Sequence, residues 1–168
     1  MTVFLVMIFG TLELARLMYV INTVQEVTRQ AARDAAMTDF TNADALAAVK
    51  TRALFGYAAL PLAPNLTTAQ LRIDYLSMKG DGTVADLTAK PASLQANARE
   101  CAHDPYGGTC VRAVRARICR TEAGTCDPLM FDPITGLIPG LSVIPIPIST
   151  TVVKAESLGF RPCTFPCN

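Results

Sequence analysis

The chain has 168 residues, of which 51% are hydrophobic and 17% are charged, and its net charge is +1. This length fits one domain with one protruding element. The charged fraction is below the roughly 25% of soluble domains, which indicates apolar surface hidden in a membrane or an assembly. The near-neutral charge argues against a strongly basic nucleic-acid binder and against an acidic solvating tail.

The first 36 residues read as one continuous helix. Residues 1–12 carry no charge and no proline, and from Leu17 onward apolar residues recur at helical spacing with polar residues on the other face. A helix of about 35 residues is roughly 50 Å long, which exceeds the diameter of the domain that the remaining chain can form. We therefore expect its first half to be buried in a bilayer, in a bundle of helices from other subunits, or in each in turn.

Glu13 and Arg16 interrupt the apolar run. Ionisable residues inside an apolar helix are costly, so they are usually paired or functional. Their separation of three positions places them on one helix face, where they can pair. A secretory signal peptide would show a basic segment and a small-residue cleavage site around this run, and the pattern favours a stalk helix instead.

A second helix is predicted over residues 42–55. Thr41-Asn42-Ala43-Asp44 fits a capping box, and the apolar stripe that follows continues to Gly56, a natural stop. Pro61 and Pro64 then mark a connection.

The rest of the head reads as strands. Alternating apolar and polar residues predict strands from Leu71 to a turn at 79–82, over about 109–120, and over about 148–157. The proline-broken apolar segment 128–147 cannot be a long helix or a central strand. We expect it to cover the open face of the sheet; the alternative is an exposed loop that contacts a neighbouring subunit.

Six cysteines, all in the last 68 residues, indicate disulfides formed in a periplasm or at a cell surface. Fifteen pairings are possible. We expect the local ones, in which short loops are closed between Cys101 and Cys110, Cys119 and Cys126, and Cys163 and Cys167.

Two possible sites in the head have simpler explanations. Four arginines of the second strand could hold phosphates, but a solvated strand face balanced by acidic residues such as Asp74 is the simpler interpretation. The single histidine, His103, lies beside Asp104 without a plausible nucleophile. We predict no catalytic residues, no cofactor and no metal site. The four arginines are Arg112, Arg115, Arg117 and Arg120.

Two motifs carry a family resemblance. The segment from Gly10 to Arg16, followed at helical distance by the segment from Gln30 to Ala36, resembles the G-x-x-E-x-x-R and A-A-R-x-x-A signature of TadE-like pilins of the tight-adherence branch of type IV pili. Type IV pilins usually carry Glu at the fifth mature position, where this chain has Leu5. We therefore expect the chain to start near its mature end or to be truncated, with Glu13 and Arg16 taking over the role of that charge within or between subunits.

The resemblance implies a subunit that is anchored in the inner membrane, trimmed by a prepilin peptidase and extracted into an extracellular filament. The predicted fold is α+β, with a stalk helix at 1–36 and, at 37–168, a small head that has a second helix and an antiparallel sheet stapled by disulfides. Alternatives are a minor or tip pilin that primes assembly, and a signal-anchored periplasmic binding protein or hydrolase. The expected partners are pilin subunits and the pilus assembly machinery. The residues expected to carry assembly are Glu13, Arg16, Gly10, Phe4, Leu5, Leu12 and Leu17.

Overall fold

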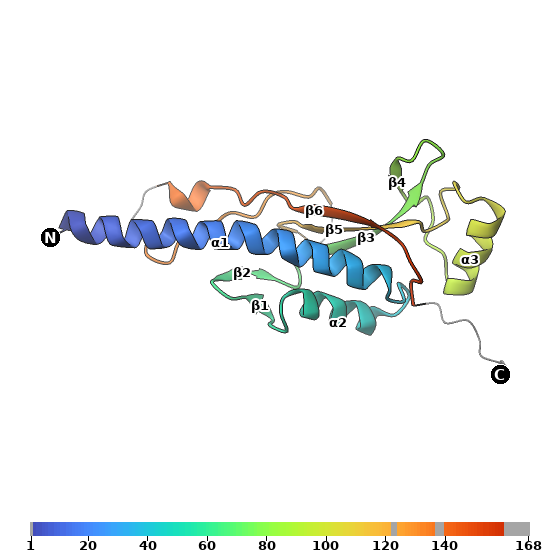
Figure 1. The fold of residues 1–168 in the computed structure, drawn as a ribbon, viewed down its shortest axis with the longest axis horizontal. Coiled ribbons are helices and arrows are strands. Elements are labelled where there is room, and N and C mark those ends of the chain that lie inside the picture. The colour runs from blue at the N-terminus through green and yellow to red at the C-terminus, as the bar shows by residue number, and fades with distance from the viewer. Residues whose placement is uncertain (1, 122–123, 137–139, 160–168) are drawn as a thin grey trace.

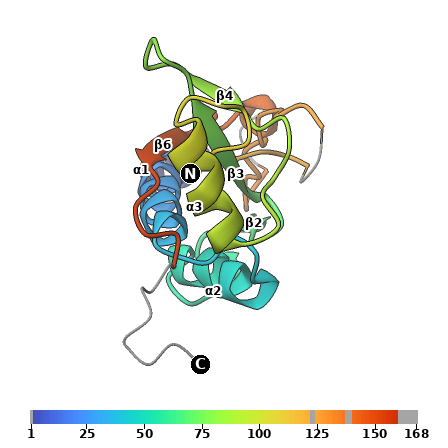
Figure 2. The same cartoon turned by 90° about the vertical axis from the view of Figure 1, so that its right-hand side faces the viewer.

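The computed structural model describes residues 2–121, 124–136 and 140–159. One long helix, α1 (Thr2–Ala36), runs the length of the molecule, and the other elements lie along it (Figure 1). The sheet lies on one side of α1, while α2 (Ala43–Ala53) and a small hairpin lie on another (Figures 1 and 2). The N-terminal turns of α1 extend beyond the sheet. The predicted α+β fold with a long N-terminal helix is therefore confirmed.

The C-terminal two-thirds of α1 form the centre of the core. Val20, Val24, Val27 and Ala31 are at most 1% exposed and pack against the sheet and the small hairpin. Small and β-branched side chains on this face let the sheet approach the helix closely. The head of the same chain thus buries one face of α1 from Gly10 onward, including part of the half for which sequence reasoning sought an external partner.

A four-stranded antiparallel sheet has the strand order β4-β3-β5-β6. The central strand β3 (Leu71–Met78) pairs with β5 (Ala113–Ile118), with Ile73 opposite Ala116. The outer strands are β4 (Val84–Asp86) and β6 (Thr150–Lys154). The three predicted strands are present, each shorter than or close to its predicted range, and β4 is an addition after the predicted turn.

The second predicted helix is also present, with a different cap. The Oδ1 of Asn42 accepts a hydrogen bond of 3.0 Å from the Ala45 backbone N–H, so Asn42 is the N-cap. Thr41, which the capping-box interpretation would use, instead bonds to the carboxylate of Asp39. Two elements were not predicted. The connection that contains Pro61 and Pro64 forms a hairpin of β1 (Ala59–Leu60) and β2 (Ala63–Thr67).

The other element that sequence reasoning missed is α3 (Leu94–His103). Its N-cap Ser93 accepts a hydrogen bond from the backbone of Ala96. Asn97 on this helix is buried, and its Oδ1 accepts a bond of 2.8 Å from the Val111 backbone N–H, which ties α3 to the start of β5. A short polar helix of this kind has too weak an apolar stripe to be recognised from its pattern.

The proline-broken segment packs into the core rather than over the open face of the sheet. Its backbone folds back on itself, since the N–H of Ile146 donates to the carbonyl of Leu129 at 2.7 Å. Leu129, Phe131, Leu141 and Ile146 are buried in the cluster that contains the valines of α1. A short 3-10 helix, η1 (Leu141–Val143), lies beside the N-terminal half of α1 (Figure 1).

Two of the three expected disulfides are confirmed. Cys101 is bonded to Cys110, which ties the end of α3 to the strand that follows, and Cys119 is bonded to Cys126 just after β5. The expected Cys163–Cys167 pair lies outside the described residues.

Tyr75 generates a test of the packing between the sheet and the helices. Its ring lies 5.5 Å from that of Phe40, and the Nζ of Lys90 lies 5.5 Å from its centroid. Its hydroxyl is buried and has no hydrogen-bond partner among the described residues. Burial, and secondarily the charge of Asp39, raise the pKa of Tyr75 above its ordinary value.

We predict that Tyr75→Phe leaves the free energy of unfolding unchanged or raises it by about 1 kcal/mol, because it removes an unpaired buried hydroxyl. A tyrosine whose folded pKa is raised contributes stability that is lost as the pH rises above its unfolded value of about 10. The variant should therefore lose less stability above pH 10 than the native chain. Denaturant unfolding at pH 8 and pH 11, with the exposed Tyr57→Phe as control, would test this, and equal alkaline losses would contradict it.

Candidate functional site

The surface of α1 that the head leaves uncovered changes character along the helix. Up to Tyr19 it is apolar, and from Asn22 to Arg33 it is polar. By length and composition, α1 is the one helix among the described residues that could cross a membrane. The exposed apolar side chains of this helix are Val3, Phe4, Leu5, Val6, Met7, Ile8, Phe9, Leu12, Leu14, Met18 and Tyr19.

Glu13 lies on the opposite face of α1, against the proline-broken segment. Its Oε1 accepts hydrogen bonds of 2.9 Å from the backbone N–H groups of Ile134 and Thr135, and one of 3.2 Å from the Thr135 hydroxyl. The residue is only 3% exposed. A carboxylate that accepts two backbone N–H groups and is buried in this way holds the segment in place.

Arg16 completes the arrangement one helical turn later. Its Nη1 donates to Glu13 Oε2 at 3.3 Å and to the Asp132 carbonyl at 2.7 Å, while its Nε donates to the Leu62 carbonyl at 2.6 Å. Its guanidinium carbon lies 5.0 Å from the centroid of the Phe131 ring. Arg16 therefore joins α1 to both the β1–β2 turn and the proline-broken segment.

We call this arrangement the Glu13–Arg16 clasp: the two side chains together with the backbone groups of Leu62, Asp132, Ile134 and Thr135. Sequence reasoning singled out the two charged residues and left open whether they pair within or between subunits. Their mutual contact lies within one chain. Their other partners are backbone groups 46 to 122 positions away, which no side-chain pattern reveals.

The remaining residues expected to carry assembly fall into two groups. Phe4, Leu5 and Leu12 are 66%, 44% and 60% exposed, so they are available to an external partner. Gly10 and Leu17 are buried within the subunit, and Leu17 belongs to the core cluster. The structure thus separates the side chains that face outward from those that hold the head to the helix.

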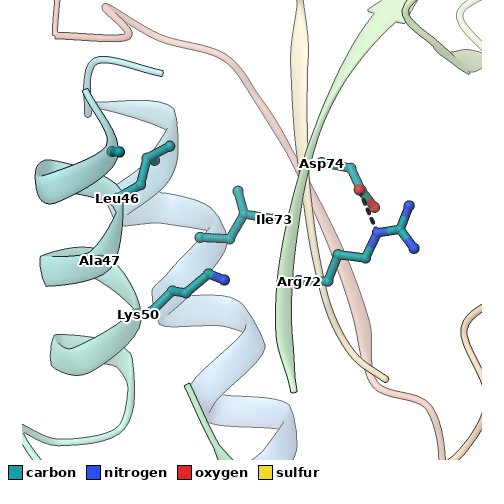
Figure 3. Close-up of a pocket in the computed structure, with 7 residues that line it drawn as sticks. Leu46, Ala47, Lys50, Arg72, Ile73 and Asp74 are labelled. Carbon is teal, nitrogen blue, oxygen red and sulfur yellow. Dashed lines mark hydrogen bonds and ion pairs between the residues drawn. The ribbon is translucent and has the colours of Figure 1, made fainter. Parts of the chain in front are cut away.

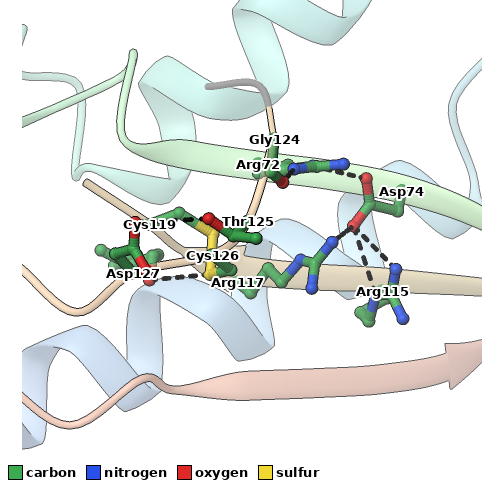
Figure 4. Close-up of a disulfide and its surroundings, with 10 residues drawn as sticks. Arg72, Asp74, Arg115, Arg117, Cys119, Gly124, Thr125, Cys126 and Asp127 are labelled. Atoms are coloured by element: carbon green, nitrogen blue, oxygen red, sulfur yellow. Dashed lines mark hydrogen bonds and ion pairs between the residues drawn. A yellow bond between two sulfur atoms is a disulfide. The ribbon is translucent and has the colours of Figure 1, made fainter. Parts of the chain in front are cut away.

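The arginines of β5 are neutralised by one aspartate. Asp74 on β3 lies opposite Arg115 in the sheet, and its carboxylate contacts Arg72 at 2.9 Å, Arg115 at 3.2 Å and Arg117 at 2.9 Å (Figure 4). Asp86 gives Arg115 a second partner at 2.9 Å. These pairs fit the interpretation as a balanced strand face and leave little unpaired charge for phosphates.

The grooves of the head show no set of reactive groups. A groove of about 370 Å³ lies between α2 and β3, where Ile73 points toward Leu46 and Lys50 while Arg72 and Asp74 lie on the other side of the strand (Figure 3). His103 is exposed at the end of α3. Within the described residues, no group of three or more His, Cys, Asp or Glu side chains could hold a metal ion.

We predict that Glu13→Ala releases residues 132–135 from α1. Removing one member of a buried ion pair leaves the other charge uncompensated, which should lower the free energy of unfolding by about 3 kcal/mol. Hydrogen exchange of the Ile134 and Thr135 amides should become roughly tenfold faster, because both lose their acceptor. Glu26→Ala, at an exposed position of the same helix, is the control. Unchanged exchange in Glu13→Ala would show that the clasp does not hold the segment.

Comparison with known proteins bears on this helix. Residues 1–33 match the model of a family described as TadE-like protein. No curated protein and no solved structure was found that matches the chain. The matched range includes the Glu13–Arg16 pair and almost all of α1. The N-terminal segment of this chain is therefore that of a TadE-like protein.

Proposed function

We propose that this protein is a structural subunit, a pilin, of a Tad-like type IV pilus and that it polymerises through α1. The observation that supports this most directly is the apolar face of α1, which the subunit leaves uncovered between Val3 and Tyr19. This face is about 25 Å long, close to the thickness of the hydrocarbon core of a bilayer. It suits a bilayer before assembly and a bundle of stalk helices afterwards.

Burial of this face supplies the driving force for assembly. Complete burial of a large aliphatic or aromatic side chain contributes about 1.5 to 3 kcal/mol, so several such contacts per neighbour give a strong association. In a membrane, lipid tails satisfy the same side chains. Extraction into a filament therefore exchanges one apolar environment for another.

The change of polarity near Asn22 places the head outside the apolar region. Glu26, Arg29 and Arg33 continue the uncovered face of α1 as a charged surface that suits water. The head would then face outward on the filament, exposed for attachment to surfaces. The proposed partners are identical or related pilin subunits, the inner membrane before assembly, and the pilus assembly machinery.

The Glu13–Arg16 clasp serves this function indirectly. Because its groups are engaged within the subunit, the two charges add no unpaired ionic group to the apolar part of the helix. The clasp also fixes where the loops of the head meet α1. Neighbouring helices can approach the opposite face, where Leu12 and Met18 are exposed, at a defined level.

We predict that Leu12→Lys abolishes filament formation while the head stays folded. The substitution places a charge on the uncovered apolar face, and a charge in such a region costs several kcal/mol. Asn22→Lys, on the uncovered polar part of the same helix, is the matched control and should assemble normally. Filaments sheared from cells and counted by mass spectrometry, with the membrane fraction measured in parallel, give the readout.

Three outcomes separate the proposals. If the native chain is abundant in sheared filaments and Leu12→Lys is absent from them, α1 carries polymerisation. If the native chain is found there only in traces, a minor or tip subunit replaces the major pilin. Retention of the native chain in the membrane fraction alone would contradict the pilin proposal and favour an anchored protein.

A further inference from the structure

The strand β6 has a free edge. It pairs on one side with β5, and the Ala155 backbone N–H donates to the Arg112 carbonyl at 2.8 Å. Backbone groups of successive strand residues alternate between the two sides. The N–H and C=O groups of Thr150, Val152 and Lys154 therefore point away from β5, and among the described residues no hydrogen bond to them is seen.

The strand β4 forms the other edge of the sheet. The Lys79 backbone N–H donates to the Thr83 carbonyl at 2.8 Å, so by the same alternation Val84 and Asp86 point their backbone groups away from β3. Figure 2 shows the hairpin that carries β4 extending beyond the body of the head. Exposed edges of this kind are templates for pairing with another strand.

The two edges run in opposite directions. All three strand pairings in this sheet are antiparallel, so β4 and β6, at positions one and four, have opposite polarity. Two copies in the same orientation can therefore join β6 of one to β4 of the next and continue the antiparallel pattern. The strands run along α1 (Figure 1), so this joining leaves the helices of both copies side by side.

The surroundings of the two edges are complementary in charge and shape. Between α1 and β6 lies a groove in two parts, of about 390 Å³ and 290 Å³, whose helix side carries Arg29 and Arg33 and whose strand side carries Lys154. On the β4 hairpin, Asp81 and Asp86 are exposed, and the Asp86 side chain keeps 79% of its surface open. A basic groove beside one edge thus matches an acidic hairpin at the other.

We infer that the free edge of β6, with the groove beside it, binds the β4 edge of a second copy of this chain. The contact is heterologous, so each copy offers a β6 edge to one neighbour and a β4 edge to another, as an open filament requires. This inference rests on the proposed function, to which it adds the contact between heads. Backbone hydrogen bonds supply affinity, and the charges select partner and direction.

Cysteine cross-linking tests the contact. Full-length chains with Val84→Cys and with Val152→Cys, differently tagged, are co-expressed, and both sheared filaments and membranes are treated with a short thiol cross-linker. Facing and diagonal pairs across antiparallel strands lie within about 8 Å, so a dimer joining the two variants is expected several-fold above either variant alone. Tyr57→Cys paired with Val152→Cys is the control, because Tyr57 is exposed away from both edges.

The outcomes separate this inference from the proposed function. The joined dimer in filaments, or in membranes without filaments, supports edge pairing, and the second case contradicts only the pilin proposal. Filaments without the dimer, a dimer equally abundant with Tyr57→Cys, or cross-linking to a different protein would each overturn the inference.

A proline substitution provides a second measurement. Val152→Pro removes an N–H that points to the free edge and not to β5, so the subunit should keep its fold, as seen by near-ultraviolet circular dichroism. Formation of the Val84–Val152 type of contact is lost in this variant, and filament yield should fall several-fold. Unchanged yield with an unchanged fold would overturn the inference.

Discussion

Packing of the sheet against one face of α1 is the interaction on which the structure depends. Val20, Val24, Val27 and Ala31 are buried there, and the strands, the β1–β2 hairpin and the proline-broken segment all contribute to the same cluster. A helix that forms the core of the head cannot be withdrawn from it without unfolding the head. The α1 helix can therefore offer a partner only the face that the head leaves free, together with the turns that extend beyond it.

The Glu13–Arg16 clasp extends this attachment toward the N-terminal end of the helix. Two charges buried beside an apolar helix would be costly alone, but here each accepts from or donates to backbone groups of loops that have few other partners. The loops in turn need these partners, because a proline-broken segment cannot pair its backbone in a regular ladder. One ion pair thus satisfies two loops and the helix at once.

Sequence reasoning predicted the elements whose patterns are strong and local. The long apolar helix, the second helix and the three alternating strands follow from periodicity, and the two described disulfides follow from short spacing. It missed α3 and the β1–β2 hairpin, since the first has a weak apolar stripe and the second contains Pro64, which disfavours a strand. In the candidate site, Glu13 and Arg16 were identifiable as costly charges. Their backbone partners were not, because backbone acceptors and donors at Leu62 or Ile134 leave no mark in a sequence.

The two proposed contacts divide the work of assembly by polarity. The free apolar face of α1 gives a large but non-directional driving force, and such a face alone would permit helices to slide or rotate against each other. Sheet edges add directional hydrogen bonds, and their opposite polarity admits only copies in the same orientation. A single chain can in this way specify a polar filament, because α1 supplies the affinity while β4 and β6 fix the direction and spacing of neighbouring heads.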